Sequence, residues 1–173
     1  GTRISLLANI NRPHETQLVT AHHLDGVGLF RTEFLFLESP NPPSFHHQLT
    51  TYRQIIRAVA DRPVVLRTLD LGGDKIPAFL ASREANPHLG SRGLRFSLAE
   101  HTLFETQVRA IVTAAQNHPR AHVLLPMVLG PGDLADAVDA IHKATRDLGG
   151  LRIPEIGAMI ETPAALFALD EIF

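Results

Sequence analysis

The chain has 173 residues, 45% of them hydrophobic and 20% charged, a balance typical of a globular domain with a sizeable core and not of a disordered segment. A formal net charge of -2 argues against a nucleic-acid partner, for which a basic face is expected. The absence of cysteine excludes disulfides and thiolate zinc sites and fits a cytoplasmic protein. No apolar run approaches the ~18 residues of a membrane span, and the opening Gly1-Thr2-Arg3 indicates no signal peptide but a cut inside a longer polypeptide.

Strand-like apolar runs alternate with helical patterns along the chain. Periodicity and turn residues predict strands at 4–10, 27–31, 64–69, 123–128 and 156–160, and helices at 15–24, 45–59, 98–116 and 164–172. One further helix is expected between Asp133, a candidate N-cap, and the stop at Gly149-Gly150. Residues 72–92 are expected to form a long loop. Strands separated by helices predict a parallel sheet.

Polar residues follow the ends of the expected strands. The second strand ends in Arg31-Thr32-Glu33, and the third ends in Arg67-Thr68 with Asp70 close behind. Polar decoration at one end of parallel strands is expected for a (β/α) barrel, which has eight strands and ~250 residues. The predicted fold class is therefore α/β, a partial (β/α) TIM-type barrel with about five of the eight strands.

Two arginines at neighbouring strand ends suggest an anion site. Arg31 and Arg67 would present two guanidinium forks where ligands of parallel α/β sheets gather. A lone strand-end arginine more often pairs with a surface carboxylate, so it is the matched pair that favours a phosphate or carboxylate ligand. Glu33 and Asp70 are expected to orient the arginines and not to bind a ligand themselves.

Four segments carry a family resemblance: Gly26–Leu37 (GVGLFRTEFLFL), Val65–Lys75 (VLRTLDLGGDK), Asn86–Arg95 (NPHLGSRGLR) and Gly157–Ala165 (GAMIETPAA). In these, the chain resembles the C-terminal, phosphoenolpyruvate (PEP)-binding domain of enzyme I, the PEP-protein phosphotransferase of the bacterial sugar phosphotransferase system. The segments RTEFLF and RTLDLGGDK distinguish this resemblance from one to the related pyruvate phosphate dikinase and PEP synthase. Residues 1–173 would then be the N-terminal portion of that barrel.

The resemblance implies a chemistry and a set of site residues. Enzyme I uses Mg²⁺ and transfers the phosphoryl group of PEP to a histidine of its own N-terminal domain, then to a histidine-containing phosphocarrier protein. Position by position, Arg31 and Arg67 match the arginines that hold the substrate phosphate, and Arg92 matches a third arginine near it. Glu161 matches one carboxylate ligand of the magnesium. Phosphoryl transfer depends mainly on positioning and charge neutralisation, which such residues supply.

The resemblance also implies what residues 1–173 lack. The family's second magnesium carboxylate, a further arginine and a catalytic cysteine acid would lie beyond Phe173, and the phosphorylated histidine lies in a separate domain. No catalytic residue is therefore assigned within this chain, which alone is expected to be inactive. Family members dimerise through this domain, so a homodimer is implied for the parent.

Several residues and functions stay open at this point. Either Arg92 or Arg95 could serve only as a rim ion pair, Lys75 could touch substrate or cap a loop, and Gly72-Gly73 favours a tight turn over an anion cradle. The alternative functions are a related nitrogen-regulatory phosphotransferase or multidomain fusion, and a non-catalytic PEP-binding or regulatory module.

Overall fold

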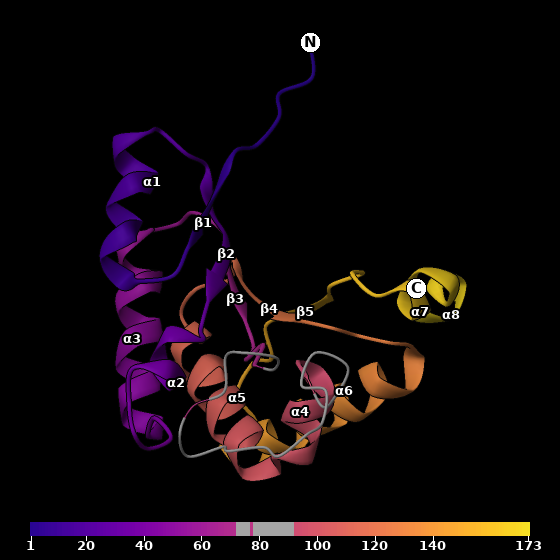
Figure 1. The fold of residues 1–173 in the computed structure, drawn as a ribbon. Helices are drawn as coiled ribbons and strands as arrows, with labels where there is room; N and C mark the ends of the chain where they lie inside the picture. The colour runs from indigo at the N-terminus through magenta and orange to yellow at the C-terminus, as the bar shows by residue number, and fades with distance from the viewer. Residues whose placement is uncertain (72–76, 78–91) are drawn as a thin grey trace.

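A five-stranded parallel sheet forms the centre of the computed structural model, which describes residues 1–71, 77 and 92–173 (Figure 1). The strands pair in chain order, each with the next. They are β1 (Leu7–Ile10), β2 (Gly26–Arg31), β3 (Val64–Arg67), β4 (Ala121–Leu125) and β5 (Glu155–Ala158). The prediction of a partial (β/α) barrel is confirmed at the level of fold class, because consecutive parallel strands are linked through helices.

Helices follow the strands along the chain. They are the 3₁₀ turn η1 (Pro13–Thr16), α1 (Gln17–Ala21), α2 (Phe34–Leu37), α3 (Phe45–Ala58), α4 (Leu94–Ala99), α5 (His101–Ala115), α6 (Pro131–Arg146), α7 (Pro163–Phe167) and α8 (Leu169–Ile172). Figure 1 shows α3, α5 and α6 on one side of the sheet. None of the helices in the described ranges is both long enough and apolar enough to cross a bilayer.

Side chains along each strand point alternately to the face of the sheet that the helices cover and to the opposite, open face. Val64 and Leu66 of β3 are fully buried against the helices, as is Phe30 of β2. Since successive strand residues point to opposite faces, Val65 and Arg67 project to the other side. In a closed barrel this second face would be the interior, so Arg67 lies at the top of the barrel wall.

Four of the expected strands extend beyond the observed ones; the strand expected at 64–69 ends at Arg67, and the other three differ as follows. The predicted strand at 4–10 begins only at Leu7, because the Leu6 amide donates to the Asp25 carboxylate. The predicted strand at 123–128 spans 121–125 instead, because Pro126 has no N–H and Met127 takes a positive φ of 54°. The strand predicted at 156–160 spans 155–158.

Helix boundaries differ for local reasons. The expected helix at 98–116 is two helices, since Glu100 leaves helical geometry (φ -95°, ψ 61°) between α4 and α5. The helix expected at 15–24 is η1 followed by α1, and the helix expected at 164–172 divides at Ala168. Asp133 is not the N-cap of α6; Gly130 is, with Pro131 in the first turn, and the Asp133 carboxylate accepts from the Leu129 amide at 3.1 Å.

Candidate anion-binding site at the carboxyl ends of the strands

Arg31 and Arg67 occupy equivalent positions on neighbouring strands. Their Cα atoms are partners in the parallel register of β2 and β3, which places both side chains on the open face of the sheet. Arg31 is exposed, whereas the Arg67 residue is only 9% exposed. The structure therefore brings the two predicted arginines together, as expected for adjacent strand ends.

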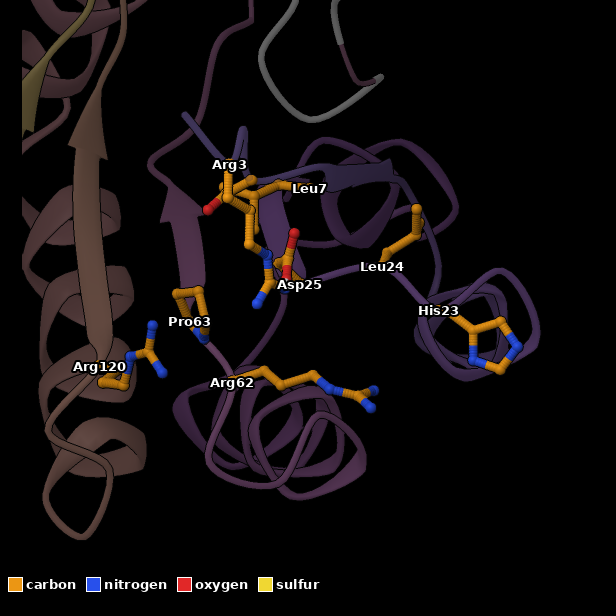
Figure 2. Close-up of a pocket in the computed structure, with 9 residues that line it drawn as sticks. Arg3, Leu7, His23, Leu24, Asp25, Arg62, Pro63 and Arg120 are labelled. Carbon is orange, nitrogen blue, oxygen red and sulfur yellow. Dashed lines mark hydrogen bonds and ion pairs between the residues drawn. The ribbon is translucent and has the colours of Figure 1, made fainter. Parts of the chain in front are cut away.

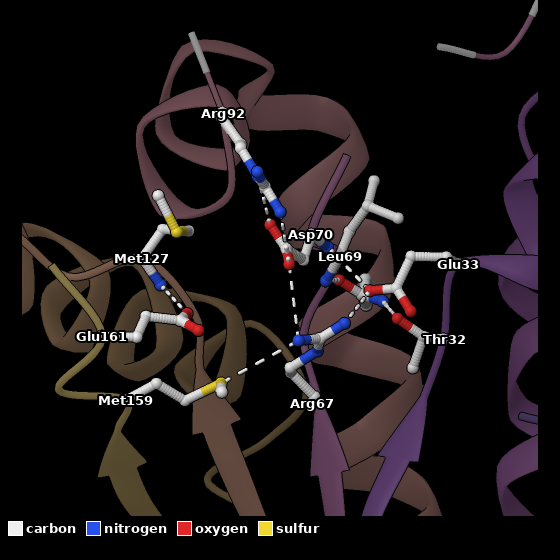
Figure 3. A network of polar contacts seen from close by, with 10 residues as sticks. Thr32, Glu33, Arg67, Leu69, Asp70, Arg92, Met127, Met159 and Glu161 are labelled. Carbon is white, nitrogen blue, oxygen red and sulfur yellow. Dashed lines mark hydrogen bonds and ion pairs between the residues drawn. The ribbon is translucent and has the colours of Figure 1, made fainter. Parts of the chain in front are cut away.

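Carboxylates hold Arg67 in place at the end of β3 (Figure 3). Its Nη2 lies 3.0 Å from Glu33 Oε1, and its Nη1 lies 3.4 Å from Asp70 Oδ2. Arg67 Nη1 also approaches the Met159 sulfur at 4.0 Å. Within the described residues its buried Nε–H has no hydrogen-bond acceptor. The orienting role expected of Glu33 and Asp70 is thus realised in the geometry around Arg67.

Asp70 links Arg67 to Arg92. Arg92 Nε lies 3.2 Å from Asp70 Oδ1, and its Nη2 lies 3.4 Å from Oδ2, so one carboxylate bridges two guanidinium groups. The next residue, Gly93, has φ 55°, and a Cβ there would lie 2.6 Å from Met127 Cβ. Because Gly93 has no Cβ, the backbone next to Arg92 can pack against Met127 in the loop after β4. All three arginines assigned from the sequence therefore lie at the same end of the sheet.

The backbone after Arg67 is held by three different elements. The Thr68 amide donates to Leu124 O of β4 at 2.9 Å. The Leu69 amide donates to Gln107 Oε1 of α5 at 2.9 Å, and the Asp70 amide donates to Glu33 Oε1 at 3.0 Å. The Thr68 amide therefore still bonds to the neighbouring strand, whereas the Leu69 and Asp70 amides leave the sheet for side-chain acceptors, and this ends the strand expected at 64–69 early.

Sequence reasoning missed Gln107, although the sequence contains a signal for it. Gln107 lies three residues after Phe104 and four before Ile111, on the buried face of α5. A glutamine within an apolar helix stripe predicts buried hydrogen-bond partners, because an unpaired buried amide is costly. Gln48 gives the same signal beside Leu49 of α3, and it is also fully buried.

Glu161 lies beyond the end of β5, directly before α7. Its Oε1 accepts from the Met127 amide at 2.8 Å, and in Figure 3 it lies next to Met159, whose sulfur approaches Arg67. Thr162 fixes the next position, since its Oγ1 donates to Val128 O and accepts from the Ala165 amide as N-cap of α7. Glu161 is thereby directed to the same end of the sheet as the arginines, with its carboxylate exposed.

The described residues do not form a metal cluster of three or more histidine, aspartate or glutamate side chains. Magnesium does not require one, because it is commonly bound by one or two carboxylates together with substrate phosphates and water. Glu161 supplies one hard oxygen donor of that kind. Among the site residues described here, Arg31, Arg67 and Arg92 are balanced in formal charge by Glu33, Asp70 and Glu161. A multiply charged anion binding there would therefore be favoured by an accompanying cation, so the residues present fit Mg²⁺.

A pocket of about 660 Å³ lies at the opposite end of the strands (Figure 2). Its walls come from segments that precede β1 to β4, including Arg3, Arg62 and Arg120. Arg3 already pairs with Asp25, and Arg120 donates to Asp61 O at 3.3 Å. Because ligands of parallel α/β sheets bind beyond the carboxyl ends, we place the candidate site at Arg67 and not at this pocket.

The whole chain, residues 1–173, matches the family described as PEP-utilising enzyme, PEP-binding domain. The chain belongs to this PEP-binding domain family. It is 43% identical over 168 residues to a PEP-protein phosphotransferase of Streptomyces coelicolor, covering 95% of the chain and 29% of that protein. It is 40% identical over 179 residues to the PEP-protein phosphotransferase of Haloferax volcanii, covering 99% of the chain and 32% of that protein.

Longer proteins with a different name are also similar to the chain. A multiphosphoryl transfer protein of Xanthomonas campestris is 39% identical over 171 residues, which are 98% of the chain and 20% of that protein. The chain therefore spans between a fifth and a third of the length of these relatives. Membership of the PEP-binding domain family confirms the resemblance found from the four sequence motifs.

Some candidates lie outside the described residues. Lys75 and Gly72-Gly73 fall in residues 72–76, and the Asn86 to Gly90 part of the third motif falls in residues 78–91. Arg95 is described and exposed on α4.

Proposed function

We propose that this chain binds PEP as part of a PEP-protein phosphotransferase. Arg67 carries the proposal: it is a buried arginine at the end of a parallel strand, in register with Arg31 and oriented by two carboxylates. Arg31 and Arg67 bind the substrate phosphate through paired N–H donors, and Arg92 adds donors from the other side of Asp70. The relatives named as PEP-protein phosphotransferases support this choice of anion.

The fixed orientation of the Arg67 guanidinium group and the positive charge of all three arginines are what these residues contribute to transfer. During the reaction the bond between phosphorus and the enol oxygen breaks, and a bond from phosphorus to a histidine nitrogen forms. The enol oxygen retains the bonding electrons, the imidazole ring loses one proton after its unprotonated nitrogen has attacked, and protonation of enolpyruvate at carbon gives pyruvate. The arginines neutralise phosphate oxygens throughout, and fixed donors do so without reorganisation during the reaction.

Glu161 is proposed as the residue of this chain that holds Mg²⁺. When bound, the ion supplies charge neutralisation and helps position the phosphoryl oxygens. Glu161 suits this role because its exposed carboxylate is aligned by the Met127 amide and lies at the arginine end of the sheet. We propose a further carboxylate from the sequence beyond Phe173 as its partner.

The remaining components are assigned to the longer polypeptide. We propose that the accepting histidine lies in a separate domain, that a histidine-containing phosphocarrier protein receives the group next, and that the parent is a cytoplasmic homodimer. The relatives named as multiphosphoryl transfer proteins are consistent with such relay chemistry.

The test uses the full-length polypeptide that contains this chain. PEP labelled in its phosphoryl group is expected to label the protein in a Mg²⁺-dependent reaction, and calorimetry is expected to detect PEP binding. The Arg67→Lys variant should lose both. Binding of PEP without labelling would instead indicate a regulatory module, and no binding would contradict the proposal.

A further inference from the structure

Gln107 is a polar residue at the centre of the helix layer. It is 1% exposed and lies in the middle of α5, between the apolar residues Phe104 and Ile111. Both ends of its side-chain amide are used in hydrogen bonds. A buried amide with partners on each side specifies one arrangement of the groups around it, because any other arrangement leaves a buried polar group unpaired.

The partners of Gln107 come from three separate elements. Its Oε1 accepts from the Leu69 amide at 2.9 Å, two residues after Arg67. Its Nε2 donates to Thr32 Oγ1 at 3.1 Å, directly after Arg31, and approaches Tyr52 Oη of α3 at 3.3 Å. A single side chain therefore holds the chain at the ends of both arginine-bearing strands.

A second buried layer fixes Gln107 itself. Tyr52 Oη donates to Gln48 Oε1 at 2.9 Å, and Gln48 Nε2 donates to Pro43 O at 3.0 Å. Thr32, Tyr52 and Gln48 are all fully buried, so water is not available to replace these bonds. Burial is also the main cause that raises the pKa of Tyr52, which keeps its hydroxyl protonated as a donor.

We propose that Gln107 is a positioning residue for the pair Arg31 and Arg67, acting through Leu69 and Thr32. This inference rests on the proposed PEP-binding function. The physical argument is that the two guanidinium groups come from separate strands, and their spacing follows the spacing of the two strand ends. Loss of the amide leaves the Leu69 N–H buried and unpaired, so the segment after Arg67 shifts to find another acceptor. A shift of ~1 Å is enough to misplace groups that act together on a phosphate.

The experiment compares the same substitution at two glutamines of α5 in the full-length polypeptide. Gln107→Met keeps the length of the side chain and helix propensity but removes the amide. The matched control is Gln116→Met at the C-cap of α5, where Gln116 hydrogen-bonds Val112 and Arg152 away from the site. For Gln107→Met we expect the dissociation constant for PEP to rise by at least about tenfold, together with faster amide hydrogen exchange at Leu69 and Asp70. Gln116→Met should leave PEP affinity unchanged even where it lowers the unfolding midpoint equally.

Thr32→Val is a second variant that keeps the shape of the side chain and removes one of the two acceptors of Gln107 Nε2, leaving Tyr52 Oη in place. We expect it to raise the dissociation constant by about threefold, in line with one buried hydrogen bond. If Gln107→Met does not fold, the PEP affinity of Thr32→Val alone tests the positioning role of Gln107. Wild-type affinity in Gln107→Met and Thr32→Val, or an equal loss in Gln116→Met, would overturn the positioning role alone. A wild-type protein that does not bind PEP would overturn the proposed function as well.

Discussion

Arg31 and Arg67 are register partners on β2 and β3, yet they are held very differently. Arg67 lies between Glu33 and Asp70, whereas no hydrogen bond or ion pair of the Arg31 side chain is formed with the residues that the structure describes. The two guanidinium groups therefore combine a fixed donor with one that is free to adjust to a ligand. This difference leads to separate expectations for the two positions.

For Arg67→Lys, we expect the rate of PEP-dependent phosphorylation of the full-length protein to fall by at least ~100-fold. Lysine keeps the positive charge but cannot reach Glu33 and Asp70 with a planar fork and still present donors to a phosphate. The matched control is Arg146→Lys, an exposed position on α6. Steady-state phosphorylation of both variants checks this, and a near-normal rate in Arg67→Lys would remove Arg67 from the site.

For Arg31→Ala, we expect weaker PEP binding without a loss of stability. The side chain is exposed and has no partner in the described residues, so the free energy of unfolding should change by less than about 0.5 kcal/mol. Removal of charge-assisted donors should raise the dissociation constant for PEP roughly 10- to 100-fold. Calorimetric titration and a denaturant melt measure the two effects. Unchanged affinity would show that Arg31 is only a surface charge.

For Glu161→Gln, we expect the concentration of Mg²⁺ needed for half-maximal activity to rise by at least about tenfold. Glutamine retains an oxygen that accepts from the Met127 amide, so the loop keeps its hydrogen bond while the negative charge is lost. Glu155→Gln is the matched control, because Glu155 lies at the other end of the same strand and pairs with His122. An unchanged magnesium dependence in Glu161→Gln would mean that Glu161 only orders the loop.

The parallel sheet and the grouping of Arg31 and Arg67 at one edge were predictable because both depend on short-range patterns. Apolar runs separated by helical periods require parallel strands, and polar residues at Arg31 and Arg67 then fall at one edge. The ends of the strands were less predictable. β3 stops at Arg67 because Gln107, 38 residues away from Leu69 in sequence, takes the Leu69 amide. Such a tertiary partner leaves no mark in the local pattern of the strand.

The break between α4 and α5 was also beyond local reasoning. The apolar period runs through Leu98, Leu103 and Phe104 without a proline or glycine, and Glu100 interrupts it through its backbone angles alone. Conversely, the sequence does mark the start of α6, because Pro131 favours the first helical turn and leaves Gly130 as the N-cap in place of Asp133.

For Glu15→Gln, we expect a loss of stability that is present at neutral pH and disappears in acid. The backbone amides of Asn11 and then Arg12 donate to the Glu15 carboxylate and lower its pKa. A lowered pKa means that this stabilisation is complete above the unfolded value of about 4.3 and is lost as the pH falls through the folded value. The variant should therefore be less stable than wild type by at most about 1 kcal/mol above ~pH 5 and equal to it in acid.

Denaturant melts of the full-length protein at several pH values measure this difference. Glu105→Gln is the control, since Glu105 is a partly exposed residue of α5 that pairs with Arg109 at 3.4 Å. A stability difference for Glu15→Gln that is the same at every pH would show that the capping interaction does not depend on the charge of Glu15.

For the isolated 173-residue chain, we expect self-association and no phosphoryl transfer. In the described part of the sheet, β1 and β5 are each paired on one side only, and such edges favour pairing with another chain. Apolar side chains are also exposed near the C-terminus, with Phe167 and Phe173 both 90% exposed. Light scattering should detect assemblies larger than a monomer, and Phe167→Asp should reduce their size, whereas His142→Asp on the exposed surface of α6 should not. A monomeric 173-residue chain that transfers phosphate from PEP would show that both the edges and the site are complete without further sequence.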